Sequence, residues 1–222
     1  MGKIALLPEE VVDHIAAGEV VERPASALKE LLENALDAGA RRVRVDVGDD
    51  ATRLMVRDDG EGMEPDDASI CFLRHATSKL RRREDLASVT TLGFRGEALA
   101  AIAAVSELEI VTRPRGSPQG FRVRVAGGQR LEAGPAAAPE GTTVWVRRLF
   151  FNTPARRRYL RSPAAERRAC LEAVARMAAA RPSVAFEVAV EGETRWASPG
   201  DGDLRAAAAA VLGPSEAAAL LP

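Results

Sequence analysis

AAGEVVERPASALKELLENALDAG, residues 16–39, is the stretch that decides the predicted fold. Pro24 suits the first turn of a helix, where its missing N–H group costs nothing. Gly39 suits the left-handed residue that follows a last helical turn. Between these two residues the apolar side chains recur at helical spacing and form one stripe, made of Leu28, Leu31, Leu32 and Ala35. We therefore predict an amphipathic helix here, with this stripe facing the core.

The opposite face of the predicted helix carries Glu30, Asn34 and Asp37, at positions i, i+4 and i+7. An acid, an amide and a second acid thus share a narrow arc on a rigid support. A solvated outer face is the ordinary interpretation of such an arc, and the wall of a nucleotide pocket is the alternative. Asn34 favours the pocket, because Asn is a poor helix former in the middle of a helix.

The composition is that of a soluble globular protein. The chain has 222 residues, of which 46% are hydrophobic and 28% charged, enough for one domain or slightly more. Its formal net charge of -1 gives no overall attraction to nucleic acid or membrane. The two cysteines, Cys71 and Cys170, are too few for a disulfide framework and favour a reducing compartment. With no signal peptide and no apolar run of membrane-spanning length, we expect a cytoplasmic protein without a membrane partner.

The periodicity along the chain predicts an α+β fold. A hairpin is predicted from two alternating segments, and period-two segments separated by Gly/Pro turns continue later in the chain. The predicted strands are 41–47, 52–57, 108–112, 121–125, 142–146 and 184–190, with 134–141 as a loop. The predicted helices are 8–17, 24–39, 65–73, 97–105, a short one capped by Asn152 and begun by Pro154, one begun by Ser162-Pro163, and an alanine-rich one after 203. We expect a two-layer sandwich of helices on a mixed, largely antiparallel sheet.

Asp58-x-Gly60-x-Gly62 follows the second predicted strand. A carboxylate there can accept a hydrogen bond from the exocyclic amine of a flat base, while the glycines let the base lie against bare backbone. An ordinary polar surface turn is the alternative. Asp59 is a second candidate for the acid, but the spacing to the two glycines favours Asp58.

Two polar loops are candidates for phosphate contacts. In the first, two glycines frame Arg95 immediately before a helix, so backbone N–H groups, the helix dipole and a cation can converge on phosphate oxygens. A plain glycine loop with a helix cap is the alternative. The second contains Thr77, Ser78 and Lys79, which offer two hydroxyls and an ammonium group. The sequence has no Walker loop, so the case for a nucleotide depends on the combination of these motifs.

The combination resembles the GHKL ATPase superfamily, which holds gyrase-type topoisomerases, heat-shock chaperones and histidine kinases. Within it the chain is similar to the MutL family of DNA mismatch-repair proteins. This resemblance extends over nearly the whole chain and is carried by IAAGEVVERP (15–24), RHATSK (74–79), GFRGEAL (93–99) and FNTPARR (151–157). The last two motifs disfavour a gyrase-like or chaperone ATPase.

The resemblance implies ATP and Mg²⁺ as cofactors, and a GHKL (Bergerat-type) ATPase fold. It implies that Glu30 is the general base for water, Asn34 the Mg²⁺ ligand and Asp58 the adenine contact. Further nucleotide contacts implied in the same way are Gly60, Gly62, Thr77, Ser78, Lys79, Thr143 and a lid formed by Gly93, Phe94, Arg95, Gly96, Glu97, Ala98 and Leu99. Asp59 stands where the family usually has Asn, which adds a negative charge beside the base site.

The resemblance also implies a nucleotide-switched clamp that couples mismatch recognition to repair. The implied partners are DNA bound without sequence specificity, a MutS-like mismatch-recognition protein, a downstream nuclease or helicase, and a second copy of the chain in an ATP-dependent N-terminal dimer. Residues 1–200 would form the ATPase domain and 201–222 the truncated start of a second, transducer domain. The family's γ-phosphate lysine lies in that second domain, so we expect weak ATP binding and slow hydrolysis by the chain alone.

A local basic cluster supports the expectation of DNA contact. Between residues 147 and 168 there are eight arginines and one acid, Glu166, and such a cluster can neutralise phosphates. The DNA contacts expected are Arg156, Arg157, Arg158 and Arg161. Compositional bias toward arginine, in a chain with three lysines, is the alternative explanation. A module that binds DNA or acts as a scaffold without hydrolysing ATP is the second functional hypothesis.

Overall fold

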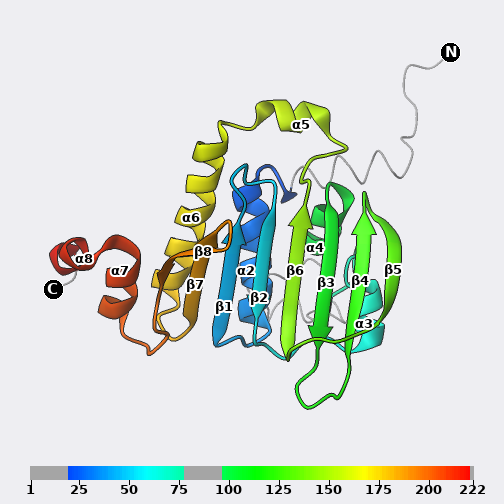
Figure 1. The fold of residues 1–222 in the computed structure, drawn as a ribbon, viewed down its shortest axis with the longest axis horizontal. Coiled ribbons are helices and arrows are strands. Elements are labelled where there is room, and N and C mark those ends of the chain that lie inside the picture. Colours follow the sequence, from blue (N-terminus) through cyan, green and yellow to red (C-terminus); the bar gives the residue numbers. More distant parts are fainter. Residues whose placement is uncertain (1–19, 78–96, 221–222) are drawn as a thin grey trace, which may run out of the picture.

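One sheet organises the part of the chain that the structure describes, residues 20–77 and 97–220 of a computed structural model. Its eight strands run in the order β5-β4-β3-β6-β2-β1-β7-β8 (Figure 1). The strands are β1 (Arg42–Val47), β2 (Leu54–Asp58), β3 (Glu107–Arg113), β4 (Gly120–Ala126), β5 (Gln129–Ala136), β6 (Gly141–Arg147), β7 (Ala185–Val190) and β8 (Glu193–Ala197). Every neighbouring pair is antiparallel except β1 and β7, which are parallel. The predicted mixed, largely antiparallel sheet is confirmed.

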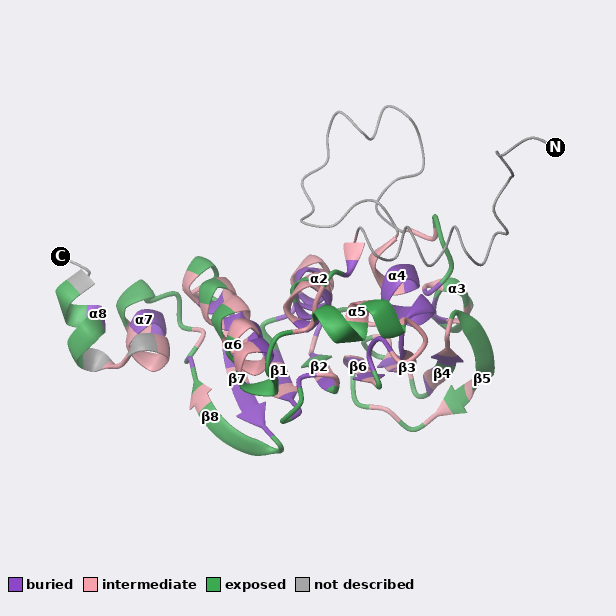
Figure 2. Cartoon of the chain, turned by 90° about the horizontal axis from the view of Figure 1, so that it is seen from above, coloured by how far each residue is buried: buried purple, intermediate pink, exposed green. Residues whose placement is uncertain are grey.

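The helices of the described residues are α2 (Pro24–Asp37), α3 (Pro65–Ile70), α4 (Ala98–Ala104), α5 (Pro154–Tyr159), α6 (Pro163–Ala180), α7 (Leu204–Leu212) and α8 (Pro214–Leu220). Helices α2, α3, α4 and α6 form a second layer over one face of the sheet, while α5 crosses beyond the strand ends and α7 and α8 lie beyond the β8 edge (Figure 1 and Figure 2). Helix α2 packs over β2 and against both α4 and α6. Its predicted apolar stripe is at most 3% exposed and lies in the main hydrophobic core. The predicted two-layer α+β sandwich is therefore confirmed.

Two of the residues predicted to begin or end a helix do so in the structure, and one does not. Gly39 has the expected positive φ of 69°, and the Ser162 side chain caps α6 by accepting from the Ala165 N–H group. The predicted cap at Asn152 is wrong. Thr153 occupies the cap position of α5, and the Asn152 amide instead donates to the carbonyl oxygen of Ala104 at 2.8 Å. Helix α3 is also shorter than predicted, since it ends at Ile70.

Two strands were missed by sequence analysis, and both are at sheet edges. β5 occupies part of the predicted loop 134–141, and β8 follows a tight turn after β7. Edge strands need no alternation of apolar residues when neither face is covered, and β5 is mostly exposed along its length. The predicted helix at 8–17 lies outside the described residues.

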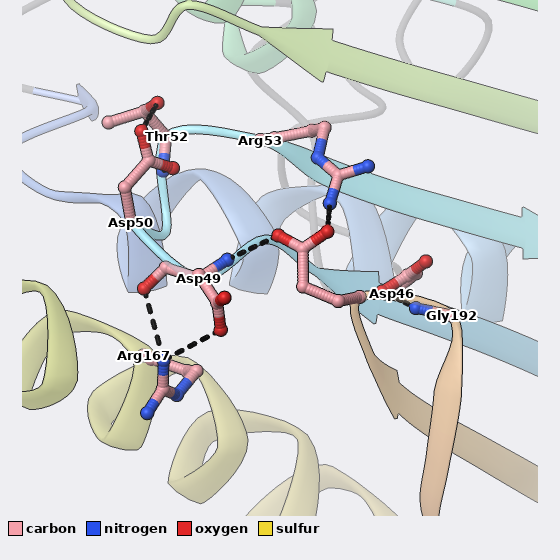
Figure 3. A network of polar contacts seen from close by, with 8 residues as sticks. Asp46, Asp49, Asp50, Thr52, Arg53, Arg167 and Gly192 are labelled. Carbon is pink, nitrogen blue, oxygen red and sulfur yellow. Dashed lines mark hydrogen bonds and ion pairs between the residues drawn. The ribbon is translucent and has the colours of Figure 1, made fainter.

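A polar network fixes the end of the sheet where the β1–β2 and β7–β8 turns meet (Figure 3). Asp49 accepts two hydrogen bonds from Arg167 of α6, at 3.0 and 3.1 Å, and its own N–H donates to Glu191 at 2.7 Å. Glu191 also pairs with Arg53, the residue before β2. These contacts tie both hairpins and α6 together, at the end of β2 that lies away from Asp58.

The chain continues after β8 through residues 198–203 into α7, which packs against α6 and β8. Within residues 20–77 and 97–220, no helix has the length and apolar character that crossing a bilayer requires. The predicted domain boundary near residue 200 stays a prediction.

Candidate functional site

The polar face of α2 is half-buried. The Glu30 side chain is 25% exposed, and Asn34 and Asp37, which follow it along the helix, are partly covered as well. Lys29 lies beside this face and pairs with Glu33 at 2.7 Å, with its ammonium nitrogen 4.0 Å from Glu30. The hydrogen bond to Glu33 raises the pKa of Lys29. The arc predicted from helical spacing is thus a partly enclosed surface with a fixed positive charge at one border.

The loop after β2 lies directly against the end of α2. The Glu61 N–H group donates to the carbonyl oxygen of Ala38 at 2.9 Å. A Cβ atom on Gly60 would lie 2.8 Å from both the Cβ and the carbonyl oxygen of Ala38. On Gly62, with φ of 72°, it would lie 2.3 Å from the carbonyl oxygen of Arg113. Both glycines therefore allow close approach within the protein itself, which differs from the stacking of a base on bare backbone expected from the sequence.

Asp58 is a buried acid at the end of β2. Asp58 is only 8% exposed, and its Oδ1 atom accepts a hydrogen bond from the Gly60 N–H group at 2.8 Å. Burial raises the pKa of Asp58 to about 6, against the opposing effect of backbone hydrogen bonds from Gly60 and Thr142. A ligand that donates a hydrogen bond to a buried carboxylate stabilises its charged form, which burial has destabilised. A buried carboxylate with a raised pKa is therefore a candidate binding site.

Asp58 belongs to a polar row that crosses three central strands on the helix-covered face. It pairs in register with Thr142 of β6, which pairs in turn with Thr112 of β3. The two threonine hydroxyls are 3.0 Å apart, and the Thr112 hydroxyl accepts from the Met63 N–H at 2.9 Å. Residues paired in register share a face of the sheet, so the row forms a polar floor beneath the loop at 58–63.

Thr143 lies on the opposite face of the sheet from Asp58, because side chains alternate along a strand and Thr143 pairs with Arg57 and Val111. The threonine beside Asp58 is Thr142, which sequence analysis passed over. Alternation with the buried Val144 and Val146 was the signal that could have identified it.

Asp59 has a structural role at the start of β1. Its Oδ1 accepts from the N–H groups of Arg41 and Arg42 at 2.7 and 2.8 Å. The Asp59 carboxylate is thus occupied by the backbone of a neighbouring strand. This favours Asp58 over Asp59 as the acid available to a ligand.

The remaining predicted contacts are described only in part. Ser78, Lys79, Gly93, Phe94, Arg95 and Gly96 lie outside the described residues. Thr77 is half-buried at the end of the first described range, and Glu97, Ala98 and Leu99 are half-buried where α4 begins. Because α4 packs against α2, the start of α4 belongs to the same helix layer as Glu30 and Asn34.

The described residues hold no group of three or more His, Cys, Asp or Glu side chains that could bind a metal ion together. A cation at α2 would therefore need ligands from a bound molecule as well. Mg²⁺ commonly binds in this way, through one or two protein oxygens, water and substrate phosphates. The amide oxygen of Asn34, on the half-buried face, fits such a role.

The basic cluster divides into two groups. Four of its arginines form ion pairs with acids: Arg147 with Glu109, Arg148 with Glu107, Arg167 with Asp49 and Arg168 with Glu172. In contrast, Arg157, Arg158 and Arg161 are exposed and make no ion pair within the described part of the chain. The positive charge available to a binding partner is therefore concentrated on α5 and on Arg161, two residues after its end.

Comparison with known proteins matches residues 22–127 to the family of histidine kinase-, DNA gyrase B- and HSP90-like ATPases. The DNA mismatch repair protein MutL of Symbiobacterium thermophilum is 52% identical over 223 aligned positions, covering 100% of this chain and 35% of that protein. MutL of Desulforudis audaxviator is also 52% identical, with 40% of its length covered. The chain thus spans a little over a third of the curated relatives it matches.

Solved structures give the same result. The Aquifex aeolicus MutL ATPase domain complexed with ADP has a TM-score of 0.69 and 31% identity, covering 86% of this chain and 69% of that one. The N-terminal domain of a DNA repair protein has a TM-score of 0.75 and 25% identity, covering 94% of this chain and 62% of that one. On these likenesses and on the fold, the chain belongs to the MutL family of DNA mismatch repair proteins and corresponds to its GHKL-type ATPase domain.

Proposed function

We propose that the chain binds ATP with Mg²⁺ and hydrolyses it to ADP and phosphate, in the space bordered by the polar face of α2 and the loop at 58–63. The observation that carries this proposal is the buried Asp58, whose raised pKa marks a carboxylate in need of a hydrogen-bond donor, on a strand and loop that pack against α2, the helix whose half-buried face carries Glu30 and Asn34. The ADP found with the related Aquifex aeolicus domain supports a nucleotide as the ligand.

The base would be recognised at the polar row. Asp58 would accept a hydrogen bond from the exocyclic amine of adenine, which replaces the water lost on burial. Thr142, on the same face, is better placed than Thr143 to join this contact. A guanine ring presents a carbonyl oxygen where adenine has its amine, and two acceptors facing each other would repel. Recognition of adenine over guanine follows from this difference.

The phosphates would lie toward the earlier turns of α2. Glu30 would orient a water molecule and take its proton, and Asn34, one turn further along the helix, would supply an oxygen to Mg²⁺. Mg²⁺ neutralises phosphate charge when it is bound. Attack by water on a phosphoryl group needs mainly positioning and charge neutralisation, so one carboxylate held on a rigid helix is sufficient. Turnover by this chain alone is expected to be slow, as the family's γ-phosphate lysine belongs to the second domain.

In the whole protein the nucleotide would act as a switch. We propose that ATP brings two copies together as a clamp, and that α5 and the segment after it contact DNA phosphates through Arg156, Arg157, Arg158 and Arg161. A MutS-like mismatch-recognition protein and a downstream nuclease or helicase would be its other partners. The exposed side chains of Arg157, Arg158 and Arg161 support the DNA contact, and the likeness to MutL proteins supports the repair role.

The direct test is a calorimetric titration of the chain with a non-hydrolysable ATP analogue and Mg²⁺, alongside a phosphate-release assay. We expect saturable binding of the ATP analogue and weaker binding of the GTP analogue. Glu30→Ala should retain binding and lose phosphate release, and normal turnover by this variant would contradict the assignment of the base. Binding without any turnover by the unmodified chain, even when the second domain is present, would favour the non-hydrolysing scaffold.

A further inference from the structure

A groove of about 340 Å³ lies where the start of α2 meets the corner between α5 and α6. It is lined by Glu22, Arg23, Arg156, Tyr159, Leu160, Arg161 and Glu166. This groove is separate from the proposed ATP site. It lies at the Arg23 end of α2, two helical turns or about 10 Å from Glu30, whereas the loop after Asp58 contacts Ala38 at the other end of the helix.

Tyr159 is the unusual side chain of this groove. It is 89% exposed, far more than the other large hydrophobic residues on the described surface. Helix α5, which it ends, has no buried residue and is drawn exposed in Figure 2. Because the Tyr159 ring is so exposed, a partner molecule can stack against the flat faces of the ring.

The charge around the ring is mainly positive, with the exposed Glu22 as the one acid of the described groove lining that Arg23 does not neutralise. Glu166 at the base of the groove is 2% exposed and is neutralised by Arg23, which donates to both of its carboxylate oxygens. The exposed guanidinium groups of Arg158 and Arg161 flank Tyr159 in sequence, and Arg157 lies on the same short helix. An exposed ring among exposed arginines fits a molecule with a flat face and anionic groups at close spacing.

Such a molecule is a nucleotide whose base is unpaired. Aromatic side chains stack on bases with little regard to sequence, and arginines bind the phosphates between them. The bases of a duplex are stacked on one another and offer no free face. We propose that the groove binds an unpaired nucleotide of single-stranded DNA, with its base stacked on Tyr159 and its phosphates on Arg157, Arg158 and Arg161. This rests on the DNA contact proposed above and assigns to α5 a preference for unpaired strands.

The test measures binding of fluorescently labelled oligonucleotides by anisotropy, at several salt concentrations. The probes are a 20-nucleotide single strand, the duplex of the same length, and a strand of the same length with an abasic tract. The variants are Tyr159→Ala, Tyr159→Phe, and Arg157→Ala combined with Arg158→Ala. All these side chains are exposed, so the fold should tolerate each change.

We expect Tyr159→Ala to weaken single-strand binding roughly tenfold, a loss in the range of one stacked base. Binding to the duplex and to the abasic strand should change less than twofold, the salt dependence should stay the same, and Tyr159→Phe should restore affinity. The arginine variant should weaken all three probes and lower the salt dependence.

Two results would overturn the proposal. If Tyr159→Ala binds the single strand as tightly as the unmodified chain, the ring does not stack. If it weakens single strand, duplex and abasic strand equally, the ring contributes to the surface without contacting a base. The broader proposal of DNA contact through these arginines is tested separately. It is refuted if the arginine variant binds every probe as tightly as the unmodified chain does.

Discussion

Arg23 and Glu166 are 143 residues apart in sequence and form an ion pair between the start of α2 and α6, in which the Glu166 carboxylate is buried and the Arg23 side chain is half-buried. The guanidinium NH2 group of Arg23 lies 2.9 and 3.0 Å from the two carboxylate oxygens, and its Nε is 3.2 Å from one of them. The same carboxylate accepts from the backbone N–H of Arg161 at 2.9 Å. One side chain therefore holds together α2, which carries Glu30, and the segment that follows α5.

Removing this carboxylate should destabilise the fold strongly. Glu166→Ala leaves Arg23 and the Arg161 N–H without their acceptor, and loss of one partner of a buried pair costs about 3 kcal/mol. Glu166→Gln keeps an acceptor oxygen and should cost less. Glu172→Ala on the same helix is the control, because its pair with Arg168 is exposed at 3.9 Å and is worth at most about 0.5 kcal/mol. Urea denaturation of the three variants measures these differences, and equal midpoints for Glu166→Ala and Glu172→Ala would contradict the role of the pair.

Asp58→Asn should abolish binding of the ATP analogue, while Asp59→Asn should change it little. At position 58 the amide replaces an anionic acceptor and can present a donor to the amine of adenine. At position 59 one oxygen accepts from both backbone N–H groups, and the amide oxygen of Asn can do the same. Calorimetric titration of both variants under identical conditions gives the answer. Equal losses of affinity would show that the two acids are not distinguished as we propose.

The raised pKa of Asp58 predicts a dependence of stability on pH. The pKa of Asp58 is about 6 in the folded state and 3.8 for an ordinary aspartate in the unfolded chain, so between these values the native state holds a proton that the unfolded state has lost. The free energy of unfolding contributed by this group therefore rises as pH falls from about 7 to about 4. The shift of roughly two units corresponds to about 3 kcal/mol.

The comparison that isolates this effect is between the nucleotide-free chain and Asp58→Asn, which cannot titrate at this position. Their difference in unfolding free energy should change with pH across the window from 4 to 6, with the variant relatively more stable at pH 7 than at pH 4. A difference that is constant over the window would mean that the Asp58 pKa is not raised.

Gly62→Ala should destabilise the chain much more than Gly116→Ala. The two glycines have nearly the same positive φ, 72° and 75°, so the backbone cost of about 1–2 kcal/mol is shared. A Cβ atom at position 62 would in addition lie 2.3 Å from the Arg113 carbonyl oxygen, while at position 116 it would have nothing within 4 Å. Thermal melts of the two variants compare them directly. Similar melting temperatures would mean that the loop after Asp58 can move away from β3 at little cost.

Elements with a strong local pattern could be predicted from the sequence. Helix α2 follows from its apolar spacing and from Pro24 and Gly39, and the β1–β2 hairpin follows from alternation. The edge strand β5 did not follow, because its side chains are exposed and its segment contains Gly134 and Pro135. Such a strand exists because β4 offers it a partner, which no local pattern encodes.

For the candidate site too, the features that depend on local pattern could be predicted from the sequence, and those that depend on tertiary packing could not. Helical spacing was sufficient to put Glu30 and Asn34 on one face, and the position of Asp58 at a strand end was sufficient to suggest an acid there. Alternation along β6 groups Thr142, rather than Thr143, with the buried Val144 and Val146, but only the pairing of β2 with β6 puts Thr142 beside Asp58. The ion pair of Arg23 with Glu166 depends on tertiary packing of two distant helices and has no sequence signal of its own.

The parallel pairing of β1 with β7 has a consequence for how this domain is made. Arg42 pairs with Ala185, so β1 has only β2 as a neighbour until β7 has been synthesised. During translation the β1 edge, with its row of backbone hydrogen-bonding groups, would remain exposed while β2 to β6 assemble. Ribosome-bound intermediates that stop short of residue 185 are therefore the species in which we expect chaperone binding and aggregation to concentrate.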